Sequence, residues 1–125
     1  MYYMSKEEAI LLYDSLMQKF GGERGIFGEI LDQCLEIPSQ HLYGKEVYPT
    51  VPDKAAAYLY FCVTLHPFTD GNKRFGYAIT RIFLLMNDYD FSANKNALYD
   101  FVMNIAKEKE TIDTVKEWMS RNTKK

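Results

Sequence analysis

One nine-residue segment, His66–Arg74, gathers most of the residues in this sequence that are suited to chemistry. It reads HPFTDGNKR and lies directly before a strongly apolar stretch. Its imidazole has an ordinary pKa of about 6.5, which suits a general base near neutral pH. Its last four residues lie where a helix is expected to begin, and the free N–H groups of a first helical turn attract anions. The segment therefore predicts phosphate binding beside a base.

Each polar residue of the segment has a predicted role. We expect His66 to act as the catalytic base. The predicted phosphate cradle consists of Gly71, Asn72, Lys73 and Arg74. Asp70 is predicted to coordinate Mg²⁺ on a nucleotide, to cap the following helix, or to do both. Phe68 has polar neighbours on its C-terminal side and is expected to anchor the loop in the core.

Six helices are predicted to position this segment, from apolar repeats of helical period and from capping residues such as Ser5, Ser92 and Thr111. They span residues 5–20, 27–37, 52–65, 71–87, 93–107 and 112–122. The segment 71–87 is apolar on nearly every side, which predicts the central helix of an all-α bundle. Residues 39–51 lack a helical period and are predicted to form a short irregular flap, with a hairpin-like piece near 45–48.

Length and composition limit the classes of protein to which this chain can belong. Its 125 residues and 14.6 kDa predict one domain, residues 1–125. Its 15 Lys and Arg and 17 Asp and Glu give a net charge of −2, which argues against direct binding to nucleic acid or to a membrane surface. Cys34 and Cys62 lack metal or redox spacing and are expected to be buried, reduced thiols. We therefore expect a soluble cytoplasmic protein.

The segment HPFTDGNKR resembles the signature loop of the Fic/Doc (fido) family, H-x-F-x-[D/N/E]-[A/G]-N-[G/K]-R. Further stretches are similar to the Doc branch, namely GGERGI at 21–26, YPT at 48–50, KAA at 54–56 and EWM at 117–119. That branch consists of short all-α toxins of bacterial toxin–antitoxin modules. The resemblance therefore implies a fido fold and a toxin.

The resemblance also implies a role for each position of the loop. In the family the histidine, here His66, deprotonates a hydroxyl of the target protein. The acidic position, Asp70, assists Mg²⁺, the glycine and asparagine form an anion hole, and Arg74 contacts the phosphates of ATP. Lys73 distinguishes two reactions. Members with glycine there transfer AMP, whereas Doc-type members with lysine hold the nucleotide reversed and transfer its γ-phosphate to a threonine of elongation factor Tu, which arrests translation.

Two departures from the family pattern affect this interpretation. Tyr77 replaces a second arginine of the AMP-transferring members, and Arg81 lies on roughly the same helix face. Phe27-Gly28 replaces an Arg-Asp pair that supports the loop in Doc-like chains. The inhibitory pattern [S/T]-x-x-x-E-[G/N] is absent, so the resemblance implies an antitoxin whose C-terminal segment folds on binding. Two alternatives stay open, a protein adenylyltransferase and a non-catalytic module that binds a ligand or partner.

Overall fold

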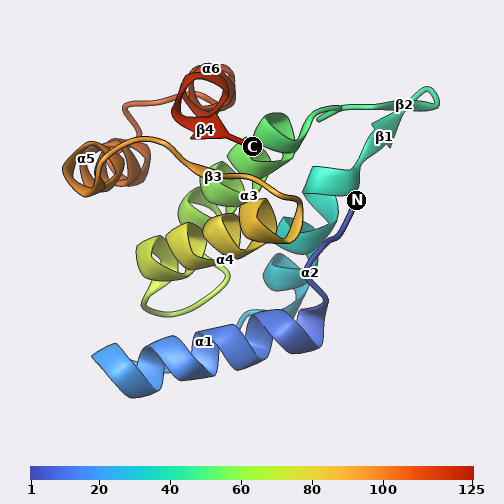
Figure 1. The fold of residues 1–125 in the computed structure, drawn as a ribbon. Helices are drawn as coiled ribbons and strands as arrows, with labels where there is room; N and C mark the ends of the chain where they lie inside the picture. The colour runs from blue at the N-terminus through green and yellow to red at the C-terminus, as the bar shows by residue number, and fades with distance from the viewer.

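The chain forms six α-helices, one short 3-10 helix and two small antiparallel sheets (Figure 1). The computed structural model describes residues 1–125. In chain order the elements are α1 (Lys6–Phe20), α2 (Gly28–Glu36), η1 (Ile37–Ser39), β1 (His41–Leu42), β2 (Lys45–Glu46), α3 (Val51–Thr64), α4 (Asn72–Met86), β3 (Asp90–Phe91), α5 (Lys95–Ala106), α6 (Ile112–Asn122) and β4 (Thr123–Lys124). The predicted all-α fold is confirmed.

Helix α3 lies at the centre of the fold, where it packs against α2, η1, α4, α5 and α6. None of its residues is exposed, and three consecutive alanines, Ala55–Ala57, let the neighbouring helices approach closely. The prediction that the segment 71–87 is the central helix is wrong. Helix α4 exposes Lys73, Arg74 and Arg81, because these positions recur along one side of the helix. Helix α4 is therefore a wall of the core with one open face.

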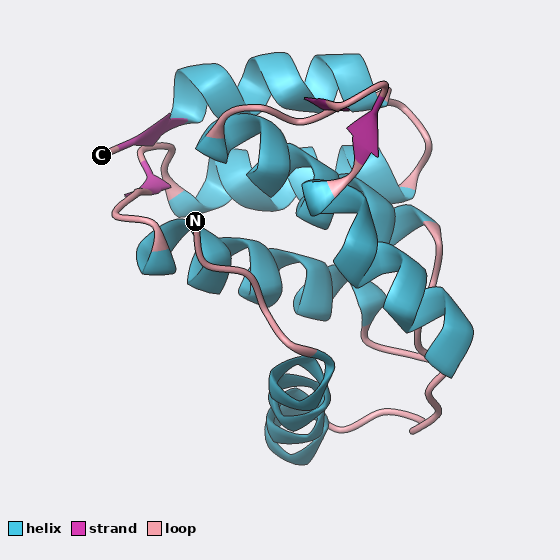
Figure 2. Ribbon diagram, turned by 90° about the vertical axis from the view of Figure 1, so that its right-hand side faces the viewer, coloured by secondary structure: helices cyan, strands magenta, loops and turns pink.

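Helix α1 forms a layer beneath α4 and runs along its buried side (Figure 1). Followed from the N-terminus in Figure 2, the chain enters α1, which is seen nearly end-on below the other helices. Ala9, Tyr13 and Met17 face inward, at the spacing of four that keeps residues on one side of a helix. This layer brings the C-terminal end of α1 to the same side of the molecule as the N-terminal end of α4 (Figure 1).

Two of the predicted helix caps are confirmed and one is wrong. Ser5 forms a capping box at the start of α1, and Thr111 does so at the start of α6. Helix α5 is capped by Asn94 and not by Ser92. Ser92 instead continues the extended segment that follows β3, where its N–H donates to the carbonyl oxygen of Asn122 at 2.7 Å. Pairing with the C-terminal strand therefore delays the start of α5.

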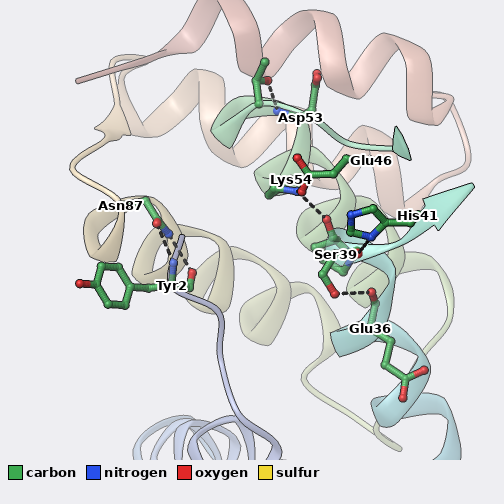
Figure 3. A network of polar contacts seen from close by, with 10 residues as sticks. Tyr2, Glu36, Ser39, His41, Glu46, Asp53, Lys54 and Asn87 are labelled. Atoms are coloured by element: carbon green, nitrogen blue, oxygen red, sulfur yellow. Dashed lines mark hydrogen bonds and ion pairs between the residues drawn. The ribbon is translucent and has the colours of Figure 1, made fainter. Parts of the chain in front are cut away.

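The segment before α3 is a hairpin fastened to the start of that helix (Figure 3). Strands β1 and β2 pair antiparallel around a turn at Tyr43 and Gly44, which both have positive φ. Lys54 is 1% exposed, and its ammonium group lies 2.8 Å from Oε1 of Glu46 and 3.2 Å from the carbonyl oxygen of Pro38. Because α3 has 14 residues, about 20 Å of helix separates this hairpin from the segment that follows α3. The predicted flap therefore precedes the third helix but does not cover the segment His66–Arg74.

Two further predictions concern buried thiols and membrane spans. Cys34 and Cys62 are free and buried, as predicted. None of the helices has the length and apolarity that crossing a bilayer requires.

Candidate active site

The segment predicted to carry the chemistry forms the loop between α3 and α4. Left-handed residues stand near its two ends, His66 with φ 54° and Gly71 with φ 85°, and together they turn the chain from one helix into the next. Phe68 is 1% exposed and stacks on Tyr13 with ring centroids 3.9 Å apart. Its ring also meets Phe75 edge-on, at 4.6 Å between centroids. The predicted anchoring of the loop by Phe68 is confirmed.

The side chain of Asn72 forms hydrogen bonds with the main chain of this loop. Its Oδ1 accepts the N–H of Phe68 at 3.0 Å, and its Nδ2 donates to the carbonyl oxygen of the same residue at 2.8 Å. Nδ2 also lies 3.3 Å from Nδ1 of His66. The two bonds to Phe68 fix the orientation of the amide, so Nδ2 is the Asn72 atom that faces Nδ1 of His66. The Asn72 side-chain amide was predicted to bind an anion. It instead forms hydrogen bonds within the loop.

A second segment, residues 23–27, supports the loop from the other side. The N–H of Phe27 donates to the carbonyl oxygen of Pro67 at 2.8 Å, and the N–H of Thr69 donates to that of Gly25 at 3.0 Å. These bonds flank an antiparallel bridge between Ile26 and Phe68. The segment that contains Phe27-Gly28 is therefore joined to the loop by main-chain hydrogen bonds.

Asp70 is tied to the main chain on both sides of the loop. Its Oδ1 accepts the N–H of Gly71 at 2.8 Å, and its Oδ2 accepts the N–H of Glu23 at 3.3 Å. The prediction that Asp70 caps α4 is wrong, because Gly71 occupies the cap position and no side chain bonds to the first turn. A carboxylate oxygen has two lone pairs, so each oxygen of Asp70 retains one for a cation. One carboxylate together with substrate phosphates is a common way to hold Mg²⁺.

The start of α4 presents positive charge that no protein group neutralises. The backbone N–H groups of Asn72, Lys73 and Arg74 have no hydrogen-bond acceptor. Neither cationic side chain belongs to any of the ion pairs in the protein. Positively charged side chains at a helix N-terminus are repelled by the positive end of the helix dipole. This arrangement therefore favours a bound anion.

A pocket of about 520 Å³ opens between the start of α4 and helix α5. Its lining residues are Asp70, Gly71, Asn72, Lys73, Arg74, Tyr77, Lys95, Leu98, Tyr99, Val102 and Met103. The predicted cradle thus lines the pocket on its α4 side, and Lys95, on α5, adds a third cation without an ion-pair partner. The other α5 residues of the lining are apolar or aromatic. A ligand with an anionic end and a flat apolar end matches this surface.

The α5 residues of the pocket were missed by the sequence analysis. Lys95 and Tyr99 lie four positions apart, which places them on one side of α5. That spacing is visible in the sequence, but nothing there indicates that this side of α5 faces α4. Only helix packing reveals the second wall of the pocket.

Two other predicted residues lie outside the lining. His66 contacts Asn72, which lines the pocket, but His66 itself does not line it.

Arg81 does not replace the missing second arginine, because its Nε and a terminal guanidinium nitrogen bond to Asp90 at 3.3 and 3.4 Å. This hydrogen-bonded pair also lowers the pKa of the Asp90 carboxyl.

Comparisons with known proteins agree with the loop and the fold. A model described as "Fic/DOC family" matches residues 3–84, which include the whole loop. The chain is also similar to a protein named Toxin Doc from Mycolicibacterium smegmatis. The two are 35% identical over 94 residues, which cover 74% of this chain and 69% of that protein.

Proposed function

This chain belongs to the Fic/DOC family, and on that basis we propose that it is a toxin that transfers the γ-phosphate of ATP to a hydroxyl group of a protein. The observation that carries the proposal is the pocket between α4 and α5. Its lining combines three cations that belong to no ion pair with free backbone N–H groups, although the whole chain has a net charge of −2. A nucleoside triphosphate supplies both the charge and the flat base that such a pocket suits.

Lys73 supports γ-phosphate transfer over AMP transfer, because AMP-transferring relatives have glycine at this position. The α5 side of the pocket carries Leu98, Val102 and Met103, which suit the base, and the α4 side begins with the loop residues next to His66. We propose that a nucleotide bound here has its base against α5 and its terminal phosphate nearest His66.

In the proposed reaction, the hydroxyl oxygen of the target attacks the γ-phosphorus, the bond from that phosphorus to the β,γ-bridging oxygen breaks, and ADP leaves. His66 takes the hydroxyl proton on a ring nitrogen. Nδ1 faces the Asn72 amide, so taking the proton on Nδ1 requires the ring to turn away from Asn72. Their contact, at 3.3 Å, is long for a hydrogen bond and costs little to break.

Lys73, Arg74 and the free N–H groups of α4 hold the phosphates and the charge that develops on them. Mg²⁺, which we propose as the metal cofactor, would neutralise phosphate charge, and Asp70 is the residue placed to hold it. The target that we propose is a threonine of a translation factor similar to elongation factor Tu, as in the Doc branch. The toxin assignment further proposes an antitoxin partner, whose C-terminal segment folds on binding.

The proposal is tested with ATP labelled at the γ- or the α-phosphate, incubated with the purified protein and a cell lysate. We expect γ-label on one protein band, no α-label, and no label with His66→Ala. His41→Ala is the matched control, because His41 is the other histidine of this chain and lies in the distant hairpin. Alpha-label on the target would establish AMP transfer instead. Growth arrest that persists without either label, and with His66→Ala, would establish a binding module.

The antitoxin is tested separately, by co-expressing this chain with the product of a small neighbouring gene. We expect growth arrest by the toxin alone and recovery when the two are expressed together. Arrest that is unaffected by the second protein would contradict that pairing without affecting the phosphotransfer result.

A further inference from the structure

The last residue of α1, Phe20, faces the guanidinium group of Arg74. The central carbon of the guanidinium lies 4.5 Å from the centroid of the phenyl ring, within the range of a cation–π contact. Phe20 is 52% exposed, and the ammonium group of Lys19 also lies over its ring, 5.2 Å from the centroid. Phe20 does not line the pocket, whereas Arg74 does. Phe20 therefore lies behind Arg74 as seen from the pocket.

This contact differs in kind from an ion pair. Arg74 has no carboxylate partner, and the Phe20 ring is the group that its guanidinium contacts. A carboxylate would hold the arginine but would also neutralise it and occupy its N–H groups. A phenyl ring carries no charge, so this contact leaves the positive charge of Arg74 available to an anion. An aromatic partner can therefore fix the arginine without competing with a phosphate.

We propose that Phe20 is a positioning residue that holds Arg74 ready for the phosphates of the nucleotide. The proposal rests on the function proposed above, because it takes Arg74 as a phosphate ligand. A free arginine side chain samples many rotamers and loses that freedom on binding. Stacking on Phe20 removes part of this loss before the ligand arrives, so it lowers the cost of binding. The α1 layer, which otherwise belongs to the core, thus contributes to the site.

The first experiment measures the affinity for Mg²⁺-ATP by calorimetry. Phe20→Leu keeps an apolar side chain but removes the ring, and we expect it to weaken binding about two- to fivefold, the range of an exposed cation–π contact. Phe20→Trp is expected to retain the wild-type affinity. Leu11→Ala removes an exposed apolar side chain elsewhere on α1 and is the control, with unchanged affinity. In the background of Arg74→Ala, Phe20→Leu is expected to have no further effect.

Three outcomes would overturn the proposal. Tighter binding by Phe20→Leu would mean that the ring withholds the arginine from the ligand. An equal loss with and without Arg74 would mean that Phe20 acts on the fold and not through the guanidinium. Failure of Phe20→Trp to retain affinity would show that an aromatic face is not what matters. In steady-state kinetics, the proposal expects a raised KM for ATP in Phe20→Leu with kcat little changed.

A second measurement separates this proposal from the proposed function. In the free protein, the ring current of Phe20 is expected to shift the NMR signals of the Arg74 side-chain protons upfield, and Phe20→Leu is expected to abolish the shift. If the shift is present but the wild-type protein does not bind Mg²⁺-ATP, the proposed function fails and the contact stands. If the shift is absent, the positioning role of Phe20 is refuted, whether or not the wild-type protein binds Mg²⁺-ATP.

Discussion

Asn72 Nδ2 lies 3.3 Å from His66 Nδ1, and its position is set by the two hydrogen bonds between the Asn72 amide and the main chain of Phe68. The residue that holds the loop thus also contacts the candidate base. Loop geometry and the orientation of the His66 ring are linked through one amide group.

We expect neutral His66 to carry its proton on Nε2 in the free protein, because Nδ1 faces a donor. Long-range ¹H–¹⁵N correlation spectra of labelled protein distinguish the two tautomers. In Asn72→Ala the donor is gone, and the tautomer ratio of His66 is expected to shift toward Nδ1–H. A proton on Nδ1 in the wild-type protein would contradict this arrangement of the amide.

Asn72 is 8% exposed, and its loss should destabilise the protein. Asn72→Ala leaves the buried N–H and carbonyl groups of Phe68 without partners, so we expect the free energy of unfolding to fall by about 2 kcal/mol. Asn72→Asp keeps the acceptor oxygen but replaces the Nδ2 donor by a carboxylate oxygen beside the carbonyl oxygen of Phe68, so it should also lower stability, and its negative charge next to Lys73 should weaken ATP binding. Urea denaturation and calorimetry measure the two effects. Wild-type stability of Asn72→Ala would contradict the role of the amide.

The contact between Gly25 and Thr69 leaves no room for a side chain at position 25. A Cβ atom there would overlap Oγ1 of Thr69 and lie 3.0 Å from its Cβ. Gly25→Ala is therefore expected to separate the segment 23–27 from the loop and to reduce activity more than stability. Thr69→Ala in the same chain should restore part of the activity. Gly28→Ala is the control, because φ of Gly28 is not positive and its added Cβ would meet only the Lys6 ammonium, at 3.7 Å.

Lys95 and Tyr99 test the two ends of the pocket separately. Lys95→Ala removes one of its three cations, so we expect the affinities for both Mg²⁺-ATP and inorganic triphosphate to fall about tenfold, with a weaker salt dependence. Lys107→Ala, at the exposed far end of α5, should change neither.

Tyr99→Ala is expected to weaken the binding of Mg²⁺-ATP and to leave that of inorganic triphosphate unchanged, because only ATP has a base for the apolar end. Calorimetry with both ligands provides the comparison. Equal losses for the two ligands would place the base outside the α5 side of the pocket.

The ion pair between Lys54 and Glu46 predicts sensitivity to acid (Figure 3). Its hydrogen bond lowers the pKa of the Glu46 carboxyl below the ordinary value of 4.5. A lowered folded-state pKa stabilises the protein above the pKa of the unfolded chain, and this contribution disappears as the pH falls through 4.5 and below. Glu46→Ala should therefore lower the Tm at pH 7 and flatten its decline in acid.

Glu36→Ala is the control for this experiment, because Glu36 is exposed near the same hairpin and forms no ion pair. Its effect on stability is expected to stay within about 0.5 kcal/mol. Parallel pH profiles for wild type and Glu46→Ala would contradict the contribution of the pair.

The sequence by itself determined the helices and the loop His66–Arg74, because both depend on residues that are close along the chain. Helical period, the cap residues Ser5 and Thr111, and the composition of the loop are local signals. The local interpretation failed where distant segments compete. Pairing with the C-terminal strand displaced the start of α5 from Ser92, and the backbone of the segment 23–27 bound Asp70, which was expected to cap α4.

Only the tertiary structure decided that α3 is central, that Lys95 and Tyr99 complete the pocket, and that Phe20 stacks on Arg74. Each of these facts joins residues that are 20 or more positions apart or belong to different helices. The face that a helix turns toward a particular neighbour is set by how all the helices pack together, since many pairings satisfy the same apolar pattern. Chemistry concentrated in nine consecutive residues was therefore readable in advance, whereas the surface that surrounds it was not.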